Sequence, residues 1–159
     1  MTELTREQIF ASLRAANQVA KDWMGFGHHP FGAVLLAPDN VQILMQQGNL
    51  GVVRHAETEL ARRAAETFSP EFLWTCTLVT TMEPCVMCAG TIYWANIGRV
   101  VYGASEATLA KLTGTSKMNP TMDLPCNIVF ESGQKAIQLI GPVVEMEDEL
   151  TDPHKGFWN

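Results

Sequence analysis

Residues 75–102, with the sequence TCTLVTTMEPCVMCAGTIYWANIGRVVY, contain the pattern that decides the fold. Residues 75–80 and 99–102 are rich in β-branched and apolar side chains, which is typical of buried strands. Between them, Pro84 suits the first turn of a helix, because the N–H that proline lacks would have no partner there. We expect this helix over 84–95 to be buried, since it is apolar nearly all round. The stretch therefore predicts a strand–helix–strand unit.

The rest of the chain alternates in the same way. Thr5 and Gln8 have the spacing of a capping box and begin a predicted first helix of about five turns, which Pro30 and the glycines before it end. Helices that alternate with strands predict an α/β fold, a three-layer α/β/α sandwich around a five-stranded mixed sheet. The other predicted elements are a strand hairpin over 31–36 and 41–45, a strand over 136–140, helices over 56–68, 106–112 and 143–150, and a long loop over 113–127.

Length and composition favour one domain over 1–159, with 151–159 as a C-terminal tail that could cap the active site of its own subunit or of a partner. Hydrophobic residues make up 47% and charged residues 18%, which excludes a disordered chain. No apolar run approaches the roughly 18 residues needed to cross a bilayer, so no membrane partner is expected. The polar start does not resemble a secretory signal, and we expect a cytoplasmic protein with reduced cysteines.

The charge balance bears on the partner. Seventeen acidic and eleven basic residues give a net charge of −6. Because proteins that bind phosphate backbones are usually basic, nucleic acid is disfavoured as a partner. The acidic run over 145–149 would also repel phosphates, so a small molecule is expected instead.

Four residues carry the predicted chemistry. Cys85 and Cys88 lie one helical turn apart and project to the same side, and His55 precedes another predicted helix. One imidazole and two thiolates are a typical three-ligand set for a catalytic Zn²⁺, which keeps its fourth position for water. Glu57, two residues past His55, is placed to take the proton of that water as a general acid/base. A bound Zn²⁺ makes hydroxide available near neutral pH, and we expect it to attack an amino-bearing ring carbon and release ammonia.

The blocks His55-Ala56-Glu57 and Pro84-Cys85-Val86-Met87-Cys88 match H-x-E and P-C-x-x-C, and the chain resembles the cytidine deaminase-like superfamily of zinc-dependent deaminases. The resemblance runs over about residues 30–102 and includes Asn49. It implies a CMP/dCMP-type deaminase domain, a hydrolase of C–N bonds in cyclic amidines, with one Zn²⁺ per subunit and a homodimer as assembly. A zinc-stabilised binding module without activity is the alternative from another class.

The substrate is less narrowly indicated. The segment 92–95 resembles bacterial guanine deaminases, so the leading prediction is a free purine base or nucleoside, with guanine converted to xanthine. The alternatives are a cytosine- or pterin-type ring, or adenosine-34 of tRNA. The residues expected at the substrate are Asn49, Ala56, Phe31, Trp94, Phe157 and Trp158, although core packing is the plainer interpretation of Trp94.

A few further residues complete the expectations. We expect His154 to be solvated and Cys126 to lie in a loop, from which it could in principle close a structural zinc site. Asp123, Glu131 and Asp152 are candidate acceptors for an exocyclic amine, although scattered acids are usually solvated.

Overall fold

The computed structural model describes residues 1–159 and contains one five-stranded sheet in the order β2-β1-β3-β4-β5. Strand β1 (Gly32–Leu36) pairs antiparallel with β2 (Ile43–Gly48) and with β3 (Thr77–Met82). Strand β4 (Arg99–Ala104) pairs parallel with β3 and with β5 (Gln138–Ile140). The sheet is therefore mixed, as predicted, and the carboxyl ends of β2, β3 and β4 lie at the same end of the sheet.

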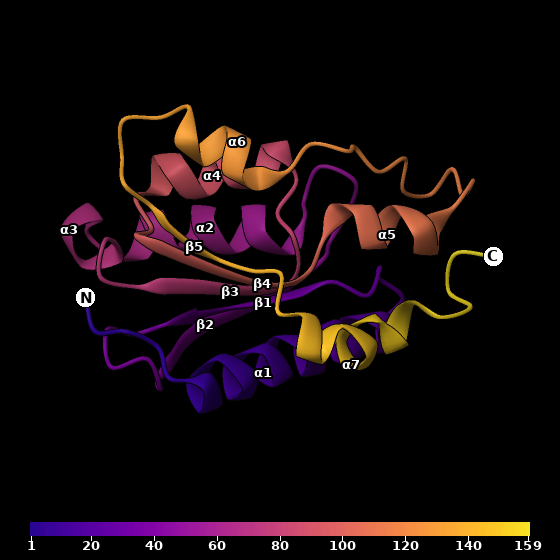
Figure 1. Cartoon of the computed structure of the whole chain (residues 1–159), viewed down its shortest axis with the longest axis horizontal. Coiled ribbons are helices and arrows are strands. Elements are labelled where there is room, and N and C mark those ends of the chain that lie inside the picture. The colour runs from indigo at the N-terminus through magenta and orange to yellow at the C-terminus, as the bar shows by residue number, and fades with distance from the viewer.

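Helices cover both faces of the sheet and make three layers (Figure 1). Helices α1 (Arg6–Gly25) and α7 (Glu147–Thr151) lie on one face. The other face carries α2 (Ala56–Thr67), α4 (Val86–Ala95) and α6 (Cys126–Glu131). Short α3 (Pro70–Leu73) follows α2, and α5 (Glu106–Thr113) follows β4. The predicted three-layer α/β/α sandwich is confirmed.

Two hydrophobic clusters hold the layers together. Seventeen buried residues, among them Leu60, Leu78 and Ile92, lie between the sheet and the α2–α4 layer. Ten others, including Leu13 and Leu150, join the sheet to α1 and α7. The capping box at the start of α1 is present, because Thr5 Oγ1 accepts from the Gln8 N–H and the Gln8 side chain accepts from the Thr5 N–H.

Several sequence-based boundaries differ from the structure. Pro84 lies two residues before the first residue of α4 and not in its first turn, because the extended backbone of the N-cap residue still separates it from the helix. The predicted loop over 113–127 ends early, because Cys126 begins α6 and is buried instead of lying in a loop. The predicted last helix is a 3₁₀ turn over Val144–Met146 followed by α7. Helix α4 is apolar all round, yet one side of it is open, and Trp94 is 81% exposed. The expectation of a fully buried helix is wrong there, because no other element covers that side.

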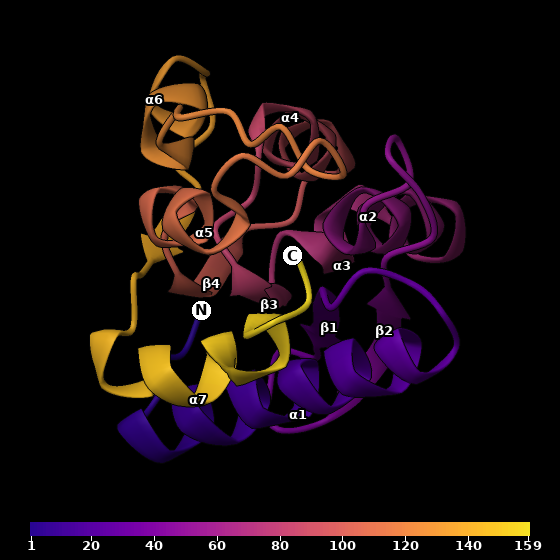
Figure 2. The ribbon, with the colours of Figure 1, turned by 90° about the vertical axis from the view of Figure 1, so that its right-hand side faces the viewer.

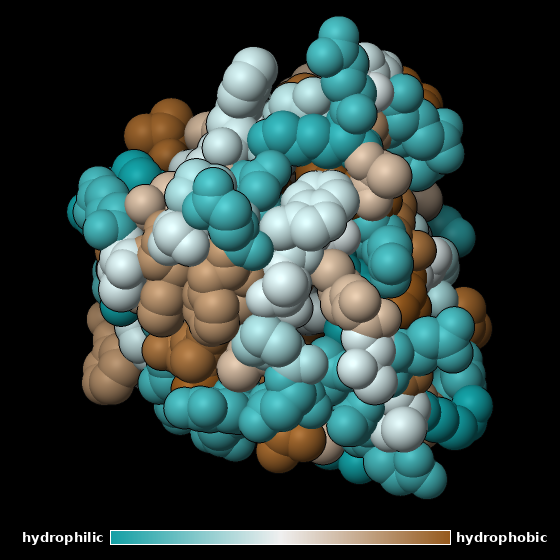
Figure 3. All heavy atoms as spheres, turned by 90° about the vertical axis from the view of Figure 1, so that its left-hand side faces the viewer, coloured by the Kyte–Doolittle hydropathy of each residue, from teal (hydrophilic) through white to brown (hydrophobic).

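The two ends of the sheet differ in character. The end that holds the carboxyl ends of β2, β3 and β4 also holds α5 and the C-terminal segment (Figure 2). The opposite end shows a group of apolar side chains surrounded by polar ones (Figure 3). No helix has the length and apolarity needed to cross a membrane.

Candidate active site

Three candidate metal ligands come from the starts of two neighbouring helices. His55 is the N-cap residue of α2 and Cys85 is the N-cap residue of α4, both with extended backbone. Cys88 follows one turn into α4, on the side that faces α2. Because the N-termini of helices carry partial positive charge, both thiols lie where a thiolate is favoured.

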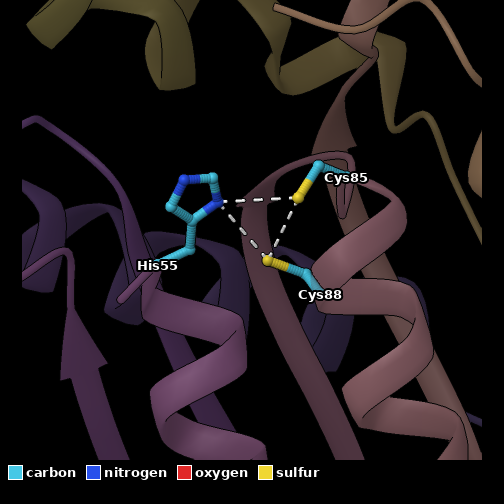
Figure 4. A group of neighbouring side chains, drawn as sticks. All are labelled: His55, Cys85 and Cys88. Atoms are coloured by element: carbon cyan, nitrogen blue, oxygen red, sulfur yellow. Dashed lines mark hydrogen bonds between the residues drawn. The ribbon is translucent and has the colours of Figure 1, made fainter. Parts of the chain in front are cut away.

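The three ligand atoms form a nearly equilateral triangle. His55 Nδ1 lies 3.6 Å from Cys85 Sγ and 3.6 Å from Cys88 Sγ, and the two sulfurs are also 3.6 Å apart (Figure 4). Tetrahedral Zn²⁺ with Zn–S near 2.3 Å and Zn–N near 2.0 Å separates its ligand atoms by about 3.5–3.8 Å. The donor set and its spacing therefore fit zinc. Cys76, Cys126 and the other histidines lie outside this group.

The charge state of the thiols also suits a cation. Hydrogen bonding from Cys88 and the proximity of His55 lower the pKa of Cys85 to about 4, against the opposing effect of burial. Cys88 Sγ accepts a hydrogen bond from Thr58 Oγ1 at 3.2 Å. The hydrogen bond shared with Cys85 and burial raise the pKa of Cys88 instead, so one of the two thiols is readily ionised and the second loses its proton when a metal takes both sulfurs as thiolates.

Glu57 lies beside this triangle and is 4% exposed. Its Oε2 lies 3.4 Å from Cys88 Sγ, and its Oε1 accepts a hydrogen bond of 2.6 Å from Thr80 Oγ1. Burial raises the pKa of Glu57 above its usual range, while the Thr80 hydrogen bond opposes that shift. A buried carboxyl next to a metal position, with a raised pKa, has the properties of a proton carrier.

A cavity of about 420 Å³ opens in front of these groups. It is of a size that suits small-molecule ligands. One wall comes from residues 117–122 of the long loop between α5 and α6, and loops of such length in compact domains often carry function. Among its lining residues are Phe31, Asn49, His55, Glu57, Cys85 and Glu106.

The family model of the cytidine and deoxycytidylate deaminase zinc-binding region matches residues 6–104, which is more than half of the chain. The chain belongs to this family. A zinc-binding deaminase domain is a hydrolase of C–N bonds, so the alternative of a binding module without activity is set aside.

Individual relatives of this zinc deaminase are named for different substrates. The probable cytosine deaminase of Schizosaccharomyces pombe is 36% identical over 99% of this chain and 96% of its own. The tRNA-specific adenosine deaminase of Haemophilus influenzae is 32% identical over 75% of each chain. A solved guanine deaminase from Nitrosomonas europaea has the same fold, with a TM-score of 0.71 at 20% identity over 96% of this chain and 85% of its own.

The predicted substrate residues divide into two groups. Asn49 and Phe31 line the cavity, and no protein group binds the Asn49 side-chain amide. Ala56 is fully buried as the first residue of α2, directly beside His55. The structure does not bring Trp94 to the cavity. Six residues beyond Cys88, a helical side chain has turned about 240° away and lies about 9 Å further along the axis.

The C-terminal tail lies behind the cavity wall. None of residues 151–159 lines the cavity, but the Trp158 ring lies 6.0 Å from the ring of Phe31, which does. Phe157 contacts the rings of Trp158 and His29. The expectation that His154 is solvated is wrong, because its ring packs against the rings of Phe31 and Trp158 and is 1% exposed. Its Nδ1 accepts a hydrogen bond from Trp158 Nε1 at 3.1 Å.

Two acidic residues at the site were missed by the sequence analysis. Glu106 lines the cavity, whereas the candidate acceptors Asp123, Glu131 and Asp152 are exposed and lie outside it. Glu83 lines it too and binds two backbone N–H groups, those of Glu106 at 2.9 Å and Cys126 at 2.8 Å. The available signal was their position just after β3 and β4, since ligands of α/β sheets bind at the carboxyl ends of strands.

Proposed function

We propose that this zinc deaminase hydrolyses the amino group of a free nucleobase, held in the cavity in front of His55, Cys85 and Cys88. The observation that carries the proposal is the buried carboxyl of Glu57 beside a three-residue ligand set. Three protein ligands leave one tetrahedral position for water, and a site that served structure alone would have no use for the neighbouring carboxyl.

Zn²⁺, when bound, lowers the pKa of water and makes it a nucleophile near neutral pH. In the proposed roles, Glu57 takes one proton from the attacking water and gives it to the ring nitrogen next to the amino-bearing carbon. It then takes the second proton and gives it to the departing amino group. Water and the amine thus become a ring carbonyl and ammonia, with no other reactant. Thr80 orients Glu57 for both transfers, because it holds Oε1 while Oε2 faces the ligand group, 3.4 Å from Cys88 Sγ.

Two bases, cytosine and guanine, are candidates for the substrate. The full-length likeness to a probable cytosine deaminase favours cytosine. The likeness of residues 92–95 to bacterial guanine deaminases, which led the sequence-based prediction, favours guanine. Both bases carry an amino group on a ring carbon next to a ring nitrogen, so the same proton transfers serve either one.

A tRNA substrate is the third candidate and is disfavoured by charge. The chain has a net charge of −6, which opposes binding of a phosphate backbone, although Glu145 and Glu149 of the acidic segment pair with Arg6 and Arg14. Binding of tRNA that is tight and falls steeply with added salt would contradict this argument. The homodimer and the cytoplasmic location stay predictions, and the first is checked by light scattering of the purified protein.

The proposal is tested by ammonia release from zinc-loaded protein given cytosine, guanine, adenine, their nucleosides and a pterin. We expect release from cytosine or guanine, and a loss of about a hundredfold or more in the Glu57→Gln variant, which cannot carry the proton. Glu66→Gln, an exposed acid later in α2, serves as the control. Full activity in Glu57→Gln, or no release from any base, contradicts the proposal.

A further inference from the structure

Glu106 has a carboxyl that the mechanism above does not use. It is the first residue of α5, two positions beyond the end of β4, and it is 5% exposed. Its side chain lines the cavity, and neither carboxyl oxygen has a hydrogen-bond or ion-pair partner in the protein. Because those oxygens are nevertheless not sealed off, they are open to whatever occupies the cavity.

The surroundings of Glu106 do not compensate its charge. The groups that act on it are Cys85, Glu57 and Glu83, which are acidic, and the more weakly acting His55. Burial and these acids raise the pKa of Glu106 to about 8. Leaving a buried polar group without a partner is unfavourable, and for that reason such groups are usually paired unless a ligand pairs them.

The backbone of Glu106 is held firmly in this position. Its N–H donates to Glu83 Oε1 at 2.9 Å, and the Glu83 N–H donates to the Ala104 carbonyl at 2.7 Å. Glu83 lies two residues before Cys85, so the loop that carries a metal ligand also fixes Glu106. A carboxyl held this way is preorganised for a ligand at a set distance from the reacting carbon.

Asn49 and Glu106 line the cavity from the ends of two different strands. Asn49 directly follows β2, Glu106 follows β4, and β1 and β3 lie between them. Three strand spacings of about 4.8 Å put the two backbones about 14 Å apart, which leaves room for one planar ring system between their side chains. The two polar groups can therefore contact two different edges of one base.

We propose that Glu106 is a specificity-determining residue, whose carboxyl accepts a hydrogen bond from the ring N–H that a free base carries and a nucleoside has lost. The inference rests on the proposed function and narrows its substrate class to free bases. Ribose hydroxyls are disfavoured as partners, because a sugar would lie further from the reacting carbon than the ring does, towards the largely exposed wall of residues 117–122. Glu106 lies deeper, at the strand ends beside the metal ligands.

The test removes the Glu106 carboxyl and the ring N–H of the substrate, separately and together, and compares the effects on kcat/KM as in a double-mutant cycle. The ratio of kcat/KM for cytosine to that for 1-methylcytosine is measured in wild type and in Glu106→Leu, which has similar bulk and no acceptor. Guanine and 9-methylguanine replace this pair if guanine is the base that turns over. We expect the variant to lose about ten- to one-hundredfold on the free base and less than threefold on the methylated one. Glu106→Gln, which keeps one acceptor, should fall between them.

Several outcomes overturn the assignment. Equal losses on both substrates indicate a structural role, no loss on either indicates no contact, and a selective loss on cytidine indicates a ribose contact. Asp123→Asn, an exposed acid of the neighbouring loop, is the matched control. Zinc content and melting temperature show whether Glu106→Leu is folded. If it is not, the same kcat/KM ratios are measured with Glu106→Gln.

A failure of the proposed function can be told apart from a failure of the role proposed for Glu106. If wild type turns over no base, calorimetric binding of cytosine and 1-methylcytosine to the zinc-loaded protein replaces the kinetic ratio. Selective weakening of cytosine binding in the variants then supports the role of Glu106 in recognition, even though deamination has failed. Equal binding of the two bases by wild type, or no binding, overturns it.

Discussion

Thr80 Oγ1 donates a hydrogen bond of 2.6 Å to Glu57 Oε1, and this contact connects the central strand β3 to the start of α2. It ties the candidate proton carrier to the most deeply buried part of the sheet, where Thr80 is fully inaccessible to solvent. The carboxyl is therefore held by the core and not only by its own helix.

Thr80→Val removes that donor at nearly constant shape. We expect kcat to fall about tenfold with KM nearly unchanged, because one charge-assisted hydrogen bond is worth about 1.5 kcal/mol or more. The hydrogen bond lowers the pKa of Glu57, so its loss lets burial raise that pKa further and moves the acid limb of the pH–rate profile to higher pH. Thr80→Ser should restore both values. Thr67→Val, on the exposed end of α2, is the control.

Cys88→Ala should abolish stoichiometric zinc binding. Two remaining ligands hold Zn²⁺ weakly, and metal that binds only the folded state stabilises that state. We expect zinc content, measured by atomic emission, to fall from about one per chain to near zero, and the melting temperature to fall with it. Cys76→Ala removes a buried thiol outside the ligand group and should keep its zinc. Full zinc occupancy in Cys88→Ala would count against the ligand set.

Glu83→Gln tests the carboxylate that joins the loops after β3 and β4. An amide has one acceptor oxygen, so its NH₂ would face one of the two backbone N–H groups that Glu83 now binds. We expect the free energy of unfolding in urea to fall by about 2 kcal/mol. Glu131→Gln, an exposed acid in α6, should change it by less than about 0.5 kcal/mol. Equal stability of the two variants contradicts the role of Glu83.

His154 makes stability depend on pH. Burial lowers the pKa of its ring to about 4, while the unfolded chain titrates near 6.5. Protonation therefore favours the unfolded state, so stability is full above pH 6.5, falls between about 6.5 and 4, and levels below that. His154→Gln keeps an acceptor for Trp158 Nε1 and cannot be protonated. Relative to wild type, it should gain about 3 kcal/mol between pH 7 and pH 4. A difference in unfolding free energy between His154→Gln and wild type that does not change with pH contradicts this.

Two tryptophans should behave oppositely. Trp158→Ala should cost about 3–5 kcal/mol, because Trp158 is buried against His29, Phe31 and His154. It should also raise KM, since Phe31 and His29 line the cavity. Trp94→Ala should change stability by less than about 0.5 kcal/mol, because Trp94 is exposed on α4. Calorimetric melting and initial rates measure both, and similar stability of the two variants would refute the supporting role of the tail.

The sequence by itself determined what depends on short-range geometry. Two cysteines one helical turn apart, and an acid two residues after a histidine, keep those relations in helices that begin where α4 and α2 do, at Val86 and Ala56. The alternation of strands and helices could also be predicted, because the spacing of apolar side chains along the chain differs between the two. That alternation predicted the three-layer sandwich. The ligand triangle of His55, Cys85 and Cys88 follows from these local rules and one packing contact between α2 and α4.

Only the tertiary structure decided which distant residues meet at the cavity. An acid at the first turn of a helix is common whatever its role, and the only local signal for Glu106 was its position just after a strand. The strand order placed Glu106 beside Glu83 and opened its carboxyl to the cavity. The burial of His154 and the exposure of Trp94 likewise depend on which surfaces other elements cover. Burial is a property of the whole packed chain, because each side chain is covered by neighbours that lie far away in sequence.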